Sequence, residues 1–255
     1  MAITLPKIEA LHTVAASSFG GAVDGGGNTF IAANDYYWSS VASGGSVSLL
    51  SAWQTLLAAV IGGTTVTLDD ATGQITVTWG SGTHTFTWAN TTARDRFGWT
   101  GNLSPAGASF VGQKQAKGVW LPNMPPTDLR SSVATQGARV SDKRVTRAPS
   151  GAVWTTRWNE WYEQTLRFVA LTKAKTWAGD ESLGNESAEQ FWADCLVKGT
   201  PIRYHKDRAV DGTHFSYDSL LTSFEPTVRR RGWEGAWDWE IPCTSYVHVA
   251  TGGGF

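Results

Sequence analysis

The residues with the clearest potential for chemistry are His205 and Asp207, followed at a short distance by His214. Two residues separated by one position on a strand lie on the same face, so an imidazole and a carboxylate could approach one metal ion. The sequence holds no H-E-x-x-H, C-x-x-C or EF-hand spacing that would strengthen such a site. We therefore interpret this segment as a strand that runs into a polar loop, and we predict neither a metal site nor a cofactor site.

Two pairs of carboxylates lie among aromatic residues: Glu160 and Glu163 beside Trp158, Trp161 and Tyr162, and Asp238 and Glu240 around Trp239. A glycoside hydrolase uses two carboxylates next to aromatic rings that stack on the sugar. However, no spacing in the sequence brings the two pairs together, and acidic residues that alternate with Trp are typical of a strand with one face in water. We interpret all four as strand residues and predict no catalytic residue.

A short basic run, formed by Arg229, Arg230 and Arg231, is the third candidate site. Adjacent guanidinium groups can bind a phosphate, but a run of this length also suits the solvated end of a strand. The sequence has no G-x-S-x-G elbow and no P-loop to support nucleophilic catalysis or nucleotide binding. We interpret the run as a solvated strand end whose arginines could form salt bridges to a neighbouring subunit, and we predict that the chain is not an enzyme.

The composition argues against several classes of partner. The 255 residues include 21 basic and 22 acidic residues, and the net charge of −1 argues against a dedicated nucleic-acid-binding protein. No apolar run approaches the roughly 18 residues that a membrane span needs, and residues 1–7 do not resemble a signal peptide. Two cysteines, Cys195 and Cys243, do not make a disulfide framework, which favours synthesis in a reducing cytoplasm.

Tryptophan is unusually frequent, with 14 residues in the chain. A Trp side chain buries a large area and keeps a polar N–H group, so it suits protein cores and interfaces. We predict that most of the tryptophans are core residues, Trp53 and Trp192 in particular. The others are expected at subunit contacts or on a glycan-binding surface.

The elements are clearest between residues 48 and 101. Ser48 can cap a helix over residues 49–60, which stops at Gly62 and Gly63. Its apolar stripe consists of Leu49, Trp53, Leu56, Leu57 and Val60. Alternation of apolar and polar residues predicts strands at residues 64–68, 74–79 and 84–88. A short helical turn over residues 93–97 is expected to end at Gly98.

The segments on either side of this stretch are poor in large apolar residues. Residues 1–35 are rich in Gly, Ala and Ser, which predicts a flexible arm. Residues 36–125 form a helix-plus-β-hairpin unit that contains a long loop over residues 102–117 and a short closing strand over residues 118–122. Phe110 and Val111 are the bulky apolar pair of this loop, so we expect them to anchor it on a neighbouring subunit.

Residues 126–255 are predicted to form a β-sandwich-like unit with one flanking helix. Alternation and turn residues predict strands at residues 136–141, 143–148, 152–158, 165–171, 201–205, 223–229 and 237–242. The helix spans residues 187–198, with a capping box of Ser187 and Gln190 and with Gly199 at its end. The whole chain is therefore predicted to be mainly β with a few short helices, a β-sandwich or barrel-like α+β fold in two packed units.

Two stretches of the sequence resemble structural proteins of bacteriophage virions. The segments TVTLDDATGQITVTW and HTFTWANTTARDRFGWTGNLS resemble a helix–hairpin–strand pattern that ends close to L-R-D-L-L-G-F-T-G-x-L-S in those proteins. Ala93 stands where that pattern has Leu, and Trp99 where it has Phe. The segment SAEQFWADCLVKGTPIRYHKD resembles, in layout, the flanking helix and strand of tail-tube and distal-tail proteins.

The resemblance implies a non-enzymatic component of the virion tail, either a tube protein or a tail-tip or distal-tail ring protein. Such a protein acts by self-assembly, so its partners are copies of itself and other phage tail proteins. It is made in the cytoplasm of the host bacterium and resides in the virion. The alternatives are a glycan- or receptor-binding tail component, suggested by the Trp content, and a hydrolase, suggested by the carboxylates.

Overall fold

The computed structural model describes residues 5–38, 48–103, 107–122, 138–147, 153–172, 188–205, 219–221, 229–230 and 236–246. This part of the chain is mainly β, with antiparallel sheets and three short helices, as predicted. The sheets do not close into a barrel. Within the described residues, no helix has both the length and the apolar character needed to cross a membrane.

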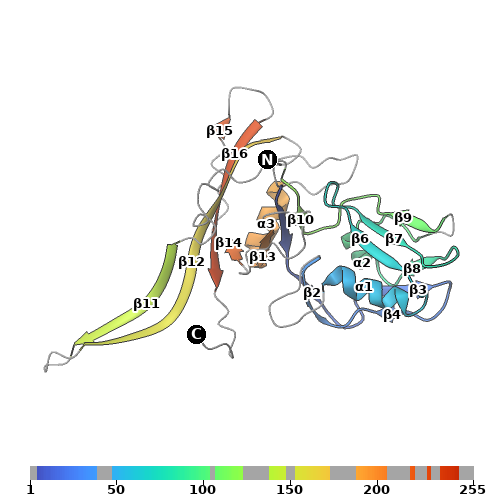
Figure 1. Cartoon of the computed structure of the whole chain (residues 1–255), viewed down its shortest axis with the longest axis horizontal. Helices are drawn as coiled ribbons and strands as arrows, with labels where there is room; N and C mark the ends of the chain where they lie inside the picture. Colours follow the sequence, from blue (N-terminus) through green and yellow to red (C-terminus); the bar gives the residue numbers. More distant parts are fainter. Residues whose placement is uncertain are drawn as a thin grey trace.

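Three small sheets build the N-terminal unit, which lies at the right of Figure 1. The first pairs β2 (His12–Val14) with β5 (Asn34–Tyr36), and the second has the order β4 (Thr29–Phe30), β3 (Gly20–Val23), β8 (Phe86–Trp88). The third has the order β6 (Thr65–Leu68), β7 (Ile75–Thr78), β9 (Ser109–Val111). Their inner faces share one hydrophobic core with two helices, α1 and α2.

Helix α1 (Leu49–Ala58) forms largely as predicted. The Ser48 hydroxyl accepts a hydrogen bond from the Ser51 N–H at 3.1 Å, which satisfies one of the unpaired donors of the first turn. The Trp53 ring is buried, and its centroid lies 4.2 Å from that of Phe97. The predicted stripe was wrong at Val60, which is 53% exposed because the helix ends at Ala58.

Helix α2 (Thr91–Arg96) is followed by a turn that requires glycine at position 98. Asn90 caps the helix by accepting a hydrogen bond from the Ala93 N–H at 2.7 Å. Gly98 has φ +81°, and a Cβ at this position would overlap the carbonyl oxygen of Lys114. The position requires glycine both for its left-handed backbone and for this close approach of two chain segments.

The N-terminal segment is not the irregular arm that its composition suggested. Residues 7–36 contain β1–β5, and Phe19, Val23 and Ile31 are buried in the core. A Cβ on Gly20 would overlap the carbonyl oxygen of Thr29, and one on Gly21 that of Thr87. These glycines therefore let β3 approach its two neighbouring strands closely, so here a glycine-rich sequence indicates tight packing.

The predicted loop over residues 102–117 also contains structure. Ser109–Val111 forms β9, which pairs with β7 in the register Val77↔Phe110. Phe110 is half-buried, and its ring centroid lies 6.4 Å from that of Trp79. Gln115 and Ala116 are buried as well. The segment packs on its own chain because short strands without a long apolar run can still add an edge to a sheet.

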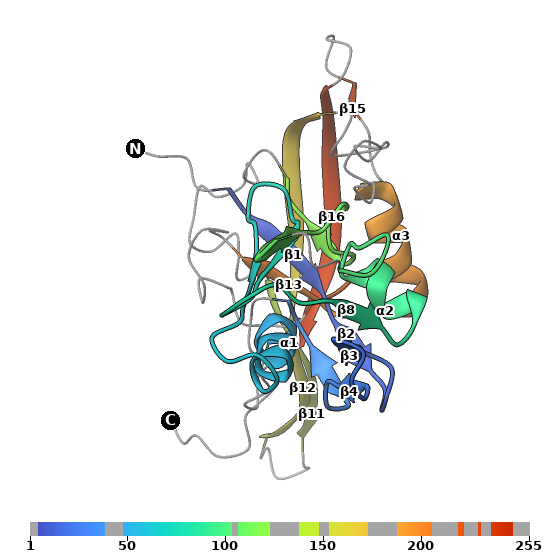
Figure 2. The same cartoon turned by 90° about the vertical axis from the view of Figure 1, so that its right-hand side faces the viewer.

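One larger antiparallel sheet forms the C-terminal unit and has the order β10-β1-β13-β14-β16-β12-β11, with β15 also paired to β16. Its strands are β1 (Lys7–Ala10), β10 (Val119–Trp120), β11 (Ala138–Arg147), β12 (Val153–Thr172), β13 (Ile202–His205), β14 (Ser219–Leu221), β15 (Arg229–Arg230) and β16 (Ala236–Tyr246). Helix α3 (Ala188–Lys198) lies along one side of the long strands (Figure 2). Trp192 on α3 is buried against Trp120, as predicted for a core residue.

The large sheet includes strands from both sides of the predicted unit boundary near residue 125. Strands β1 and β10 precede that boundary, yet both belong to the large sheet, where β1 pairs with β13. Ile8 and Trp120 accordingly lie in the C-terminal core. The two units are thus two hydrophobic cores joined by chain segments that cross from one to the other.

The long strands replace shorter predicted ones. β11 is continuous where two strands were predicted at residues 136–141 and 143–148, and β12 joins those predicted at residues 152–158 and 165–171. The register shifts between Asp142 and Lys143, opposite Trp158, and again after Phe168. Such bulges disturb the alternation of apolar and polar side chains. The sequence pattern therefore predicted two short strands where the structure has one long strand. Of the strand predicted at residues 223–229, only Arg229 lies within the described residues.

Candidate functional site

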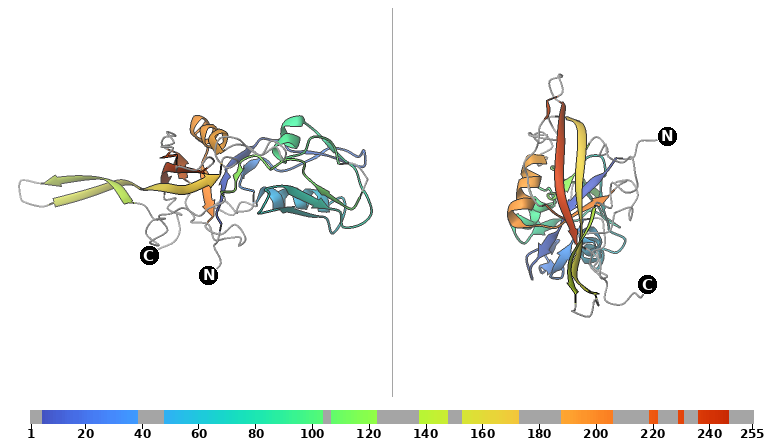
Figure 3. Two further views of the ribbon diagram at one scale, coloured as in Figure 1. Left: turned by 90° about the horizontal axis from the view of Figure 1, so that it is seen from above. Right: turned by 90° about the vertical axis from the view of Figure 1, so that its left-hand side faces the viewer.

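The most distinctive surface feature is the hairpin of β11 and β12. Its two strands pair from Ala138↔Glu163 to Arg147↔Val153. β12 pairs with β16 only from Trp161 onward, so among the described residues 153–160 pair with no strand other than β11. At roughly 3.3 Å per residue, this part of the hairpin extends about 26 Å beyond the sheet. Figures 1 and 3 show it projecting away from the rest of the molecule, and we call residues 138–147 and 153–160 the ribbon.

The ribbon lacks the support that stabilises the other strands. β11 ends the strand order, so among the described residues its outer edge carries no partner strand. An isolated two-stranded hairpin is marginally stable in water, and an uncovered edge offers N–H and C=O groups to another chain. A second chain that packs on the ribbon could pair with the outer edge of β11 and satisfy these N–H and C=O groups.

The structure keeps the two groups of carboxylates apart, as Glu163 and Glu240 show. Glu163 pairs with Thr244 on β16, whereas Glu240 pairs with Arg167, so the two glutamates are four positions apart along the strands. That offset is about 13 Å, wider than the roughly 5–9.5 Å of glycosidase carboxylate pairs. Glu240 forms an exposed ion pair with Arg167, with 3.4 Å between Oε1 and Nε. Glu160 lies on the ribbon opposite Ser141.

His205 belongs to a buried ionic cluster. Its Nε2 lies 3.3 Å from Oε2 of Glu9, and Nζ of Lys7 lies 3.4 Å from Oε1 of the same carboxylate. Lys7 also contacts Oδ1 of Asp70 at 3.2 Å. The side chains of Lys7, Glu9 and His205 are 2%, 0% and 2% exposed. The described residues contain no group of three candidate metal ligands, and Asp207 and His214 lie outside those residues.

The cluster occupies one face of the β1–β13 pair. Lys7 pairs with His205 and Glu9 with Arg203, while Ile8 and Tyr204 alternate with them and face the C-terminal core. The Arg203 guanidinium lies over the ring of Tyr37 at 4.1 Å, and Asp70 comes from the turn after β6. The contact between the two units is therefore partly ionic and buried. In the segments KIEA and IRYH, charged residues alternate with apolar or aromatic ones, which is the pattern that could have predicted this pair of strands. It was not recognised in the sequence.

The residues predicted as assembly contacts are not gathered in one place. Phe110 packs against Trp79 in its own core, while Val111 beside it is about half exposed. Arg229 and Arg230 form β15, opposite Asp238 and Trp237 of β16, and Arg231 lies outside the described residues. Phe110 thus packs on its own fold, and the assembly role of all five residues stays a prediction.

Eight of the tryptophans have described side chains, and all eight are buried: Trp38, Trp53, Trp79, Trp88, Trp99, Trp120, Trp192 and Trp239. A buried indole cannot stack on a sugar. Any glycan-binding surface would therefore depend on tryptophans whose side chains lie outside the described set.

Comparison of the chain with protein-family models finds no match, and searches of curated proteins and of solved structures find none either.

Proposed function

We propose that the chain is a non-enzymatic structural subunit of a bacteriophage tail, which assembles with copies of itself into a ring or tube and contacts other tail proteins. The observation that carries the proposal is the projecting ribbon. A ribbon of this length has too little surface against its own chain to be stable by itself. In an assembly it can lie on a neighbouring subunit, where its free edge and its faces become buried.

The sequence resemblance supports the same proposal. The segment that resembles virion proteins covers the hairpin of β6 and β7, helix α2 and the turn at Gly98. The segment that resembles tail-tube and distal-tail proteins covers α3 and β13, a helix on the side of a sheet and one of its strands. On this proposal the protein is made in the host bacterial cytoplasm and then becomes part of the virion tail.

A ribbon-shortened variant tests the proposal. Asp142 and Asn159 are direct partners across the hairpin, so residues 143–158 can be replaced by the two-residue turn Asn-Gly. We expect the wild type to form large assemblies at micromolar concentration, measured by light scattering and negative-stain imaging. The variant should stay monomeric, with an unchanged thermal midpoint because both cores are intact.

Val60→Lys is the matched control, since it changes an exposed residue at the end of α1, far from the ribbon. The control should assemble as the wild type does. Assembly of the ribbon-shortened variant at wild-type concentrations would contradict the proposal. A wild type that stays monomeric and binds polysaccharide would instead support the glycan-binding alternative.

A further inference from the structure

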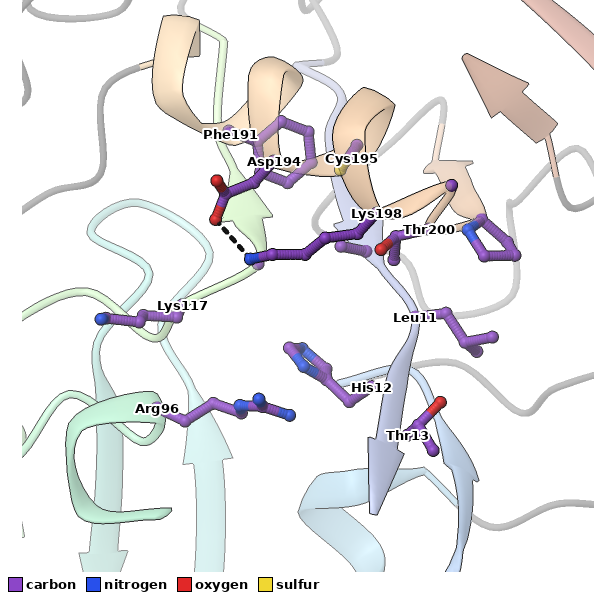
Figure 4. A pocket seen from close by; sticks show the side chains of 14 residues that line it. Leu11, His12, Thr13, Arg96, Lys117, Phe191, Asp194, Cys195, Lys198 and Thr200 are labelled. Atoms are coloured by element: carbon purple, nitrogen blue, oxygen red, sulfur yellow. Dashed lines mark hydrogen bonds and ion pairs between the residues drawn. The ribbon is translucent and has the colours of Figure 1, made fainter. Parts of the chain in front are cut away.

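A pocket of about 360 Å³ lies where the two units meet. Its walls come from the junction of β1 and β2, from the end of α2, from the segment before β10 and from the last turns of α3. The polar side chains that line it are His12, Thr13, Arg96, Lys117, Asp194, Lys198 and Thr200 (Figure 4). None of these residues belongs to the ribbon or to the buried ionic cluster.

The charge of the pocket is predominantly positive. Lys198 forms an ion pair with Asp194, with 2.8 Å between Nζ and Oδ2. Arg96 and Lys117 also line the pocket, and neither has an acidic partner among the described residues. Arg96 is held in place because its guanidinium lies 5.0 Å from the centroid of the Phe19 ring. In Figure 4 the ammonium end of Lys117 points away from the pocket, whereas the Arg96 guanidinium and the Lys198 ammonium group face the space beside His12. The pocket thus presents Arg96, which has no acidic partner among the described residues, and Lys198, which shares its charge with Asp194.

His12 adds a buried polar group to the same wall. Its side chain is 6% exposed, and Nε2 has no hydrogen-bond partner among the described residues. Burial and the charge of Arg96 lower its pKa to about 3, although the charge of Glu9 opposes them, so the ring is neutral at pH 7. A neutral imidazole retains one N–H donor. In Figure 4 the ring extends from its strand toward the space between Arg96 and Lys198.

The neighbours of His12 fix its position. Its ring meets that of Trp38 edge-on, with 5.1 Å between centroids. On the other side it lies against Gly118, where an added Cβ would come within 2.9 Å of Nε2. Gly118 also has φ +75°, which favours glycine. The imidazole is therefore preorganised, and a buried polar atom without a partner is costly unless a ligand satisfies it.

We propose that this pocket binds a small free oxyanion, such as phosphate or the carboxylate of a small metabolite. Arg96 and Lys198 would supply charge-assisted hydrogen bonds from opposite sides, and His12 would supply a fixed polar contact between them (Figure 4). Because Arg96 belongs to the N-terminal unit and Lys198 to α3 of the C-terminal unit, the bound anion would link the two units. This inference is independent of the proposed assembly.

Inorganic phosphate is the probe for the test. Binding is measured by titration calorimetry and by thermal unfolding in phosphate against chloride at matched ionic strength. We expect saturable binding by the wild type and a rise in its thermal midpoint, since a ligand that binds only the folded state stabilises it. Arg96→Gln and Lys198→Gln should each weaken binding about tenfold, the effect of losing one charge-assisted hydrogen bond.

Arg94→Gln and Lys114→Gln are the matched controls, because they remove the same charges from positions outside the pocket. Both controls should bind phosphate as the wild type does. The ribbon-shortened variant should also bind it normally, which separates this test from that of the assembly. Absence of saturable binding, or equal weakening by pocket and control substitutions, would overturn the inference. The Lys198 side chain is 63% exposed, so its variant remains informative if Arg96→Gln fails to fold.

Discussion

Replacing Glu9 by Gln should destabilise the protein far more than a change at a surface ion pair. Glu9 is fully buried and lies 3.4 Å from Nζ of Lys7 and 3.3 Å from Nε2 of His205. Removing its charge takes one carboxylate contact from the buried ammonium group of Lys7, whose contact with Asp70 at 3.2 Å stays in place. Breaking a buried ion pair in this way costs about 3–5 kcal/mol, which is a large part of the roughly 5–15 kcal/mol stability of a typical domain.

The Arg167–Glu240 pair provides a matched comparison. Its Nε–Oε1 distance is also 3.4 Å, but the two side chains are 49% and 46% exposed. Arg167→Gln should therefore cost less than about 1 kcal/mol, because water screens an exposed pair. The two variants differ in burial while the distance is the same, so the difference between them measures the effect of burial.

Urea unfolding followed by Trp fluorescence gives both free energies. The double variant Lys7→Met, Glu9→Gln should lose less stability than the two single variants together, because it removes both charges of the Lys7–Glu9 pair at once. A loss below about 1 kcal/mol for Glu9→Gln, a typical value for a surface change, would refute the reasoning. Strict additivity in the double variant would also refute it.

Three further predictions concern single side chains. Trp192→Ala should cost about 3–5 kcal/mol in urea unfolding, since the ring is fully buried; a loss below about 1 kcal/mol would contradict the core assignment. Phe110→Ala should cost about 2 kcal/mol, less than a fully buried Phe, because the ring is half-buried beside Trp79; a variant that loses assembly but no stability would contradict this. The hydrogen bond to Asp24 raises the pKa of His84, so Asp24→Asn should lower that pKa in an NMR titration. Because the pKa of His84 is raised, its pairing stabilises the fold at low pH, and this contribution is lost as the pH rises through the folded-state pKa; an unchanged pKa in the variant would contradict the assignment.

Local patterns predicted the N-terminal elements well. The helix that begins after Ser48, the hairpin of β6 and β7 and the turn at Gly98 all depend on residues close together in the sequence. Their capping groups, alternation and glycine positions are therefore visible without the fold. The core positions of Trp53 and Trp192 followed from helical spacing for the same reason.

Long-range pairing was the part that sequence reasoning could not supply. The position of β1 between β10 and β13 joins segments more than a hundred residues apart, and no local signal specifies it. Lys7 and Glu9 fell in the predicted flexible arm, but both side chains are buried by groups from β13 and from the N-terminal unit. Gly20 and Gly21 indicated flexibility because their close neighbours are known only from the structure.

The pocket was missed for a related reason. His12, Arg96, Lys117 and Lys198 come from four separate segments, and each alone resembles an ordinary strand, helix or loop residue. The spacing of His205 and Asp207 is visible in the sequence, but the acidic contact that the structure gives His205 is Glu9, from β1. Residues that converge only through tertiary packing leave no motif in the chain.

Hydrogen exchange of the β12 amides in free and assembled protein tests the role of the ribbon most directly. Residues 153–160 pair only with β11 in the described structure, whereas Leu166 and Phe168 pair with Ile241 and Trp239 of β16, are buried in the C-terminal core and serve as the internal reference. We predict that the amides of residues 153–160 exchange rapidly in the dilute monomer and become protected on assembly, while the reference amides are protected in both states. Equal exchange of residues 153–160 in the monomer and in the assembly would contradict the proposal that the ribbon lies on a neighbouring subunit.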